Sequence, residues 1–220
     1  MDETSYTKEE MNRAPRPSDR EFDLSGGVLC LDFANTVDGR KNPSKSDDLL
    51  PAYRDLVRFA KQSRVLPTQS ARNLVAAGLR NPQKANAVLR GAVMLREAIY
   101  RIFSNVAAAR IADSHDVALV KKFVDEAWKH RELIAAGRSF RWEWRQTKDA
   151  DALAYMLWPI AQSAADLMTS DKRNSVRQCG ADDCAWLFLD ESRNHSRRWC
   201  DMKTCGNRQK ARRHYALKHG

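Results

Sequence analysis

A chain of 220 residues, 43% of them hydrophobic, is long enough for one larger domain and a small appendage. It has 38 Lys and Arg against 28 Asp and Glu, so its formal net charge is +10. No stretch approaches the roughly 18 apolar residues that a membrane span needs. The first residues are polar and acidic, and they lack the positive and apolar regions of a secretory signal. We therefore expect a protein of the reducing cytoplasm, without a membrane segment.

The N-terminal part begins with a polar segment followed by an apolar run. Residues 1–20 combine prolines with many polar side chains and are predicted to be disordered. From Glu21 to Thr36 the apolar residues have strand-like density around a turn at Ser25, Gly26 and Gly27, which predicts a short hairpin. Cys30, within this run, is expected to be a buried small hydrophobe.

Four helices are predicted next. Ser46, Asp47 and Asp48 can cap a helix that reaches Ala60, and a second begins at Pro67 and Thr68. Asn81 followed by Pro82 marks the start of a long amphipathic helix, in which apolar residues recur every three or four positions as far as Val106. A fourth helix is expected over residues 113–134.

A strand and a last helix complete this region. Phe140, Trp142 and Trp144 alternate with charged residues, which predicts a half-buried strand. The last helix is expected over residues 150–170, bent at Pro159. We interpret the tryptophans, with Trp128 and Trp158, as core or strand-face residues rather than a ligand cage. The fold class is therefore mainly α with a small β element (α+β), with a helical domain over residues 21–170 and a small C-terminal module over residues 171–220.

Motifs of catalysis are missing from the sequence. It contains no HExxH or GxSxG pattern, and no Gly-rich phosphate loop follows a predicted strand. His115 and His130 lie in charged helical surroundings without a paired nucleophile, and we expect each to be a surface or helix-end residue. We therefore do not expect an enzyme.

Four of the five cysteines lie near the C-terminus, with the spacing Cys179-x4-Cys184-x15-Cys200-x4-Cys205. Two close pairs separated by a short insert are typical of a structural zinc site, since each pair can wrap one side of a tetrahedral ion. Disulfides are the first alternative, but a reducing compartment favours metal. An iron–sulfur cluster is the second. We predict one structural Zn²⁺ held by these four thiolates.

The segments around the cysteines are predicted as a strand, a basic loop and a helix. Residues 185–190 are predicted to form a strand with Trp186 and Phe188 on one face, packed over the metal site. Gly206 is expected to permit a tight turn, after which Asn207 caps a helix that ends near residue 218.

Positive charge is concentrated in this module. From residue 192 to the end there are nine Lys or Arg and one acidic residue, Asp201. Such a cluster is the electrostatic footprint of a nucleic-acid binder. The predicted nucleic-acid contacts are Arg193, Arg197, Arg198, Lys203, Arg208, Lys210, Arg212 and Arg213.

Two segments resemble known families. The string Cys205-Gly206-Asn207-Arg208, with the strand at residues 186–190 and the preceding Arg197-Arg198-Trp199-Cys200, resembles the CGNR zinc finger. Residues 26–36, GGVLCLDFANT, resemble the start of the ABATE domain that commonly precedes that finger in bacteria. The resemblance implies a stress-related transcription regulator whose finger binds DNA, with the four cysteines named above as its zinc ligands.

The leading hypothesis is a bacterial cytoplasmic DNA-binding regulator. Its helical domain is expected to dimerise or to sense a small-molecule effector, with the Trp-rich strand lining the effector pocket. The alternatives are an RNA-binding module, in which aromatic side chains stack on unpaired bases, and a protein-interaction module.

Overall fold

The computed structural model of the chain describes residues 20–42, 44, 46–145 and 150–219, apart from the side chains of residues 150, 151, 213 and 219. The α-helices are α2 (Leu29–Ala34), α3 (Tyr53–Gln62), α4 (Thr68–Arg80), α5 (Pro82–Ala107), α6 (Ser114–Trp128), α7 (Leu157–Thr169) and α8 (Asn207–His219). Two 3₁₀ helices, η3 (Ala150–Ala154) and η4 (Asp171–Ser175), and a π-helix, η5 (Met202–Gly206), join them. None of the helices in the described part is both long and apolar enough to cross a membrane.

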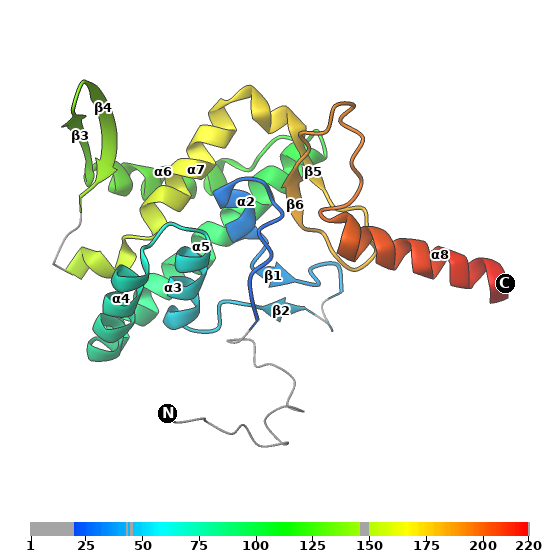
Figure 1. Ribbon diagram of the computed structural model, residues 1–220, viewed down its shortest axis with the longest axis horizontal. Coiled ribbons are helices and arrows are strands. Elements are labelled where there is room, and N and C mark those ends of the chain that lie inside the picture. The colour runs from blue at the N-terminus through cyan, green and yellow to red at the C-terminus, as the bar shows by residue number, and fades with distance from the viewer. Residues whose placement is uncertain (1–19, 43, 45, 146–149, 220) are drawn as a thin grey trace, which may run out of the picture.

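Within the described ranges, three antiparallel strand pairs accompany the helices. They are β1 (Val37–Asp38) with β2 (Asp47–Asp48), β3 (Arg131–Ala136) with β4 (Ser139–Trp144), and β5 (Val176–Gln178) with β6 (Leu187–Leu189). The protein is therefore mainly α with small β elements, as predicted. Figure 1 shows the β3–β4 hairpin projecting at one end of the molecule and helix α8 at the other.

The hydrophobic core is built around α5, the longest helix, and the short helix α2 that lies against α5 and α7. Cys30 and Phe33 of α2 are fully buried, so the expectation for Cys30 is confirmed. Burial raises the pKa of the Cys30 thiol to about 12, which keeps it protonated. The predicted hairpin over residues 21–36 is wrong, because this apolar run is buried on every side and forms a helix instead. A continuous apolar run does not distinguish strand from helix.

The turn before α2 was predicted correctly, and it is sterically demanding. Gly27 has φ +84°, a conformation that favours glycine. A Cβ on Gly26 would lie 2.8 Å from an Oδ1 of Asp32, whose carboxylate accepts the Gly26 N–H at 2.8 Å. The two glycines therefore let the chain fold tightly over the start of α2.

The beginnings of the next helices agree only in part with the sequence pattern. Helix α3 starts at Tyr53 rather than at the predicted cap near Asp47, because Asp47 and Asp48 form strand β2. The Asp48 carboxylate instead receives two hydrogen bonds from the buried Arg96 guanidinium, at 2.7 and 2.8 Å. Helix α4 is confirmed, and Asn81 caps α5 as predicted, accepting the Lys84 N–H at 3.1 Å.

The fourth predicted helix is too long. Helix α6 ends at Trp128, and Ile134 belongs to strand β3, which the sequence pattern did not predict. Strand β4 is confirmed, but its aromatic face is largely open, with Phe140 75% and Trp142 51% exposed. Trp158, in contrast, is buried and stacks on His130, with ring centroids 3.9 Å apart.

The last helix of the domain is shorter than expected, and Pro159 does not lie in its interior. Residues 150–154 form a 3₁₀ helix, and α7 begins only at Leu157. Pro159 therefore lies in the first turn, where a missing N–H costs no helical hydrogen bond.

His115 is exposed at the start of α6, while His130 follows the end of α6 and is buried. Of the residues 1–20 that were predicted to be disordered, residues 1–19 lie outside the described part of the chain, so the disorder stays a prediction.

The hydrophobic core continues into the C-terminal module. Val176 of β5 pairs with Leu189 of β6, and both belong to the main core together with Leu187. Phe188 points to the other face of β6 and packs among the C-terminal cysteines. One short strand therefore serves the main core with one face and the cysteine cluster with the other.

Candidate metal centre and nucleic-acid interface

Two local turns present the four cysteines. Cys179 directly follows β5, and its N–H bonds to the Trp186 carbonyl at 2.8 Å, which closes the first turn over Cys184. The second turn leads from Cys200 into the π-helix η5, which ends just after Cys205. The Asp201 side chain caps η5 by accepting the Thr204 N–H at 2.7 Å.

The four sulfur atoms form one buried cluster. All four Sγ atoms lie within 4.8 Å of one another, and each cysteine is at most 4% exposed. The Cys184–Cys200 and Cys200–Cys205 Sγ distances are 3.7 and 3.6 Å. A tetrahedron with Zn–S bonds of about 2.3 Å has S–S edges of about 3.8 Å. A disulfide would need about 2.0 Å. The cluster therefore has the size of a tetrathiolate zinc site.

The electrostatics of the cluster also call for a cation. The hydrogen bonds that Cys179 receives from Cys184 and Cys200 lower the pKa of the Cys179 thiol. Donation to Cys179 raises the pKa of Cys184 and Cys200, and burial raises that of Cys205. One thiolate forms readily, but four adjacent thiolates need a bound dication. These residues fit one structural zinc ion, which would supply folding energy rather than catalysis.

Donors around the sulfurs offset the remaining negative charge, since four thiolates exceed a dication by about two charges. The Trp186 N–H donates to Cys184 Sγ at 3.4 Å, and the Arg208 guanidinium donates to Cys205 Sγ at 3.3 Å. Lys41, from the helical domain, donates to the carbonyls of Cys179 and Ala181 at 3.1 and 3.0 Å. Lys41 was not predicted, because it lies far from the cysteines in the sequence.

The helical domain also binds the outer edge of strand β6. Asn35 donates its side-chain N–H to the Leu187 carbonyl and accepts the Leu187 N–H, both at 2.8 Å. The Leu189 N–H bonds to the Gly26 carbonyl at 2.8 Å on the same strand. Trp186 donates its indole N–H to the Val37 carbonyl at 3.0 Å. The two ends of the segment that resembles the ABATE start, Gly26 and Asn35, thus pair with the free edge of β6 without forming a strand.

The prediction that one face of residues 185–190 packs over the metal site is confirmed. Trp186 and Phe188 both pack against the cysteine cluster.

Two details at the start of α8 differ from expectation. Gly206 does not form a left-handed turn, but a Cβ there would collide with the Met202 side chain within η5. Asn207 has helical dihedrals and is the first residue of α8 rather than its cap, since Asp201 caps the combined η5–α8 helix.

The basic loop over residues 191–198 is organised by Asp190, which is fully buried. Its carboxylate accepts the Ser192 N–H and hydroxyl at 3.0 and 2.5 Å and the Arg197 N–H at 3.0 Å. Its carbonyl lies 2.9 Å from His195 Nδ1. Burial alone would raise the pKa of Asp190, but the hydrogen bonds from Ser192 lower it. The loop therefore has a defined shape although its side chains are exposed.

The eight basic residues predicted to contact nucleic acid fall into different groups. Arg197 bonds to the carbonyls of Trp199 and Cys200 and lies over the Phe188 ring. Arg208 and Arg212 each form an ion pair with Asp183 at 2.9 Å. Among the described residues, the exposed side chains of this set that form no ion pair with a carboxylate are those of Arg193, Arg198, Lys203 and Lys210. The Arg213 side chain lies outside the described atoms.

Two family models match the chain. The ABATE model, described as "Putative stress-induced transcription regulator", matches residues 27–171. The CGNR zinc finger model matches residues 175–218. A comparison with curated proteins found no match. The first match spans more than half of the chain, and the second contains all four cysteines. The chain therefore belongs to the ABATE family and ends in a CGNR zinc finger.

Proposed function

We propose that this protein is a cytoplasmic bacterial transcription regulator that binds duplex DNA through its zinc module. The observation that carries the proposal is the position of helix α8, which extends from the zinc module away from the rest of the fold (Figure 1). It carries five Lys or Arg and no acidic residue. A helix of about 13 residues is roughly 20 Å long and fits the major groove of B-DNA.

The cations have two roles in this proposal. Arg193, Arg198, Lys203 and Lys210 are exposed on the loop and the C-terminal helices, and they contact phosphates or base edges. Arg208 and Arg212 are held by Asp183, and they fix the direction of α8 relative to the first cysteine turn. Burial alone would raise the pKa of Asp183, but Arg212 and Arg208 lower it, so the carboxylate stays ionised.

The helical domain supplies the regulation. It dimerises or senses a small-molecule effector, and it is coupled to the zinc module through Asn35 and Gly26 at strand β6. One finger is a small footprint, so a dimer or a second contact surface raises the affinity to a useful level.

The test is fluorescence anisotropy of labelled duplex DNA with zinc-loaded protein over a salt series. Each neutralised phosphate contributes roughly −0.9 to the slope of log K against log salt. The four exposed cations among the predicted contacts give a slope of about −3.6 per bound module, whereas all eight predicted contacts would give about −7. The double variant Arg198→Gln, Lys210→Gln should reduce the slope magnitude by about 1.8.

A matched control is Lys122→Gln with Arg141→Gln, which removes two exposed cations of the helical domain. This variant should keep the wild-type slope. Single-stranded RNA serves as the competitor. Loss of the duplex signal to RNA would select the RNA-binding alternative, and absence of binding to both nucleic acids would refute the proposal in favour of a protein-interaction module.

A further inference from the structure

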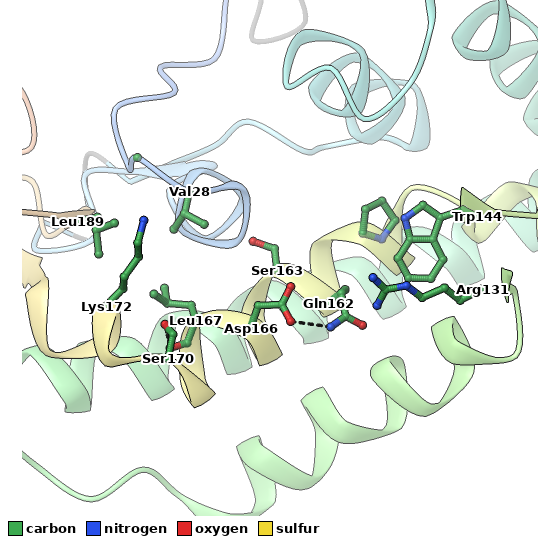
Figure 2. Close-up of a pocket in the computed structure, with 12 residues that line it drawn as sticks. Val28, Arg131, Trp144, Gln162, Ser163, Asp166, Leu167, Ser170, Lys172 and Leu189 are labelled. Carbon is green, nitrogen blue, oxygen red and sulfur yellow. Dashed lines mark hydrogen bonds between the residues drawn. The ribbon is translucent and has the colours of Figure 1, made fainter. Parts of the chain in front are cut away.

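A cavity of about 430 Å³ lies where the helical domain meets the zinc module. Helix α7 forms its floor, the turn at Gly27 and Val28 and the end of β6 close one end, and the β3–β4 hairpin closes the other. Figure 2 shows Arg131 and Trp144 together at the hairpin end and Lys172 with Leu189 at the opposite end. Cavities of this size accept small molecules.

The hairpin end of the cavity offers a cation. Arg131 is half-buried, and its guanidinium lies 5.1 to 5.5 Å from the ring centroids of Trp128, Trp142 and Trp144. Within the described residues no carboxylate forms an ion pair with Arg131. Lys172, in contrast, is paired with Glu191 at 3.3 Å. A guanidinium fixed against indole rings is pre-organised to bind a carboxylate through two parallel hydrogen bonds.

The floor of the cavity limits the charge of a ligand. Asp166 presents its carboxylate along α7 and accepts a hydrogen bond from Gln162 at 2.7 Å. This carboxylate repels a dianion such as a phosphate monoester, but it accepts a hydroxyl or amino donor. Val28, Leu167 and Leu189 provide an apolar wall.

We propose that this cavity binds a small monocarboxylate with an apolar or aromatic body and a hydrogen-bond donor. The ligand carboxylate meets Arg131, its donor meets Asp166, and its body lies along the apolar wall beside Trp144. Its role as effector rests on the proposed function, because it deepens the sensing assigned there to the helical domain.

The position of the cavity connects ligand binding to the zinc module. Leu189 lines the cavity, and its N–H is held by the Gly26 carbonyl. A Cβ added to Gly27 would lie 3.3 Å from Leu189 Cβ, so the turn packs closely against β6 and a shift of the turn is expected to move this strand. The next residue, Asp190, organises the basic loop through Ser192 and Arg197. A ligand against Leu189 therefore acts one residue away from the loop proposed to contact DNA.

Isothermal titration of the zinc-loaded full chain tests binding, with 3-hydroxybenzoate as the probe. 3-Hydroxybenzamide has the same shape without the charge, and isophthalate carries a second carboxylate in place of the hydroxyl. We expect 3-hydroxybenzoate to bind at least about tenfold more tightly than either. Arg131→Gln should lower 3-hydroxybenzoate affinity about tenfold or more. Arg141→Gln, on the other face of the same hairpin, is the control and should not change it.

Asp166→Asn is the second variant, since it leaves the hairpin intact. It should reduce the preference for 3-hydroxybenzoate over isophthalate. Equal affinity for 3-hydroxybenzoate and 3-hydroxybenzamide, or 3-hydroxybenzoate binding that survives Arg131→Gln in a protein with unchanged circular dichroism, would overturn the proposal, as would the absence of 3-hydroxybenzoate binding. DNA anisotropy is measured separately on the ligand-free chain. Loss of 3-hydroxybenzoate binding with intact DNA binding refutes only this inference, while absent DNA binding with charge-selective 3-hydroxybenzoate binding refutes only the proposed function.

Discussion

Replacing Asn35 with alanine should weaken the attachment of the zinc module to the helical domain. The Asn35 side chain is 2% exposed and makes both of its hydrogen bonds to the backbone of Leu187, each at 2.8 Å. These bonds close the outer edge of β6, which would otherwise present unpaired backbone groups in the protein interior.

The expected magnitude follows from those two groups. Alanine leaves one N–H and one carbonyl of Leu187 buried without a partner, at roughly 1.5 kcal/mol each, so the free energy of unfolding should fall by about 3 kcal/mol. In a domain of this size that corresponds to a decrease in Tm of roughly 6–12 °C. Because β6 also carries Phe188 against the cysteine cluster, the variant should release zinc faster as well.

Urea unfolding followed by circular dichroism measures the first effect, and a metallochromic dye measures zinc release. Asn73→Ala is the control, since Asn73 is exposed on α4 and its side chain only accepts a hydrogen bond from Gln69. The control should change the unfolding free energy by less than about 0.5 kcal/mol. A similarly small change for Asn35→Ala would show that the Asn35–Leu187 pairing does not hold the module.

Three further outcomes are expected. A mercurial thiol reagent should release one zinc per chain, measured with the dye, and abolish duplex binding, measured by anisotropy. Burial raises the pKa of Asp32 from 3.8 to about 7, so the folded chain retains a proton that the unfolded chain loses, and stability falls as pH rises through this range. Asp32→Asn should remove this decline, on the order of 4 kcal/mol, in urea titrations. Asp190→Ala should speed trypsin cleavage at Arg193, Arg197 and Arg198, with unchanged zinc content, and unchanged cleavage would contradict the role of Asp190.

The metal centre could be predicted because its determinants are local. Each pair of cysteines is separated by four residues, so each turn brings two thiols together whatever the rest of the fold does. The alternation that placed Trp186 and Phe188 on one face is equally local. The cap at Asn81 and Pro82 depends only on neighbouring backbone groups. These features were confirmed.

The errors arose where tertiary contacts decide the local structure. The run around Cys30 is buried on all sides, and its packing against α5 and α7 selects helix over strand. Asp48 has the sequence context of a cap but is bound by Arg96, which lies 48 residues away. Helix α6 ends at Trp128 because the chain turns into a hairpin that apolar periodicity alone does not mark.

Counting cations in the sequence overestimates the interface in a similar way. The sequence places Asp182 and Asp183 in the first cysteine turn, far from α8, yet the fold brings them against Arg208 and Arg212. A nucleic acid must then either leave these pairs intact or displace Asp183. The proposed contacts assume that the ion pairs stay intact, because the same pairs set the direction of α8. In this proposal the zinc site and the ion pairs shape the module, and the cations that remain exposed bind the nucleic acid.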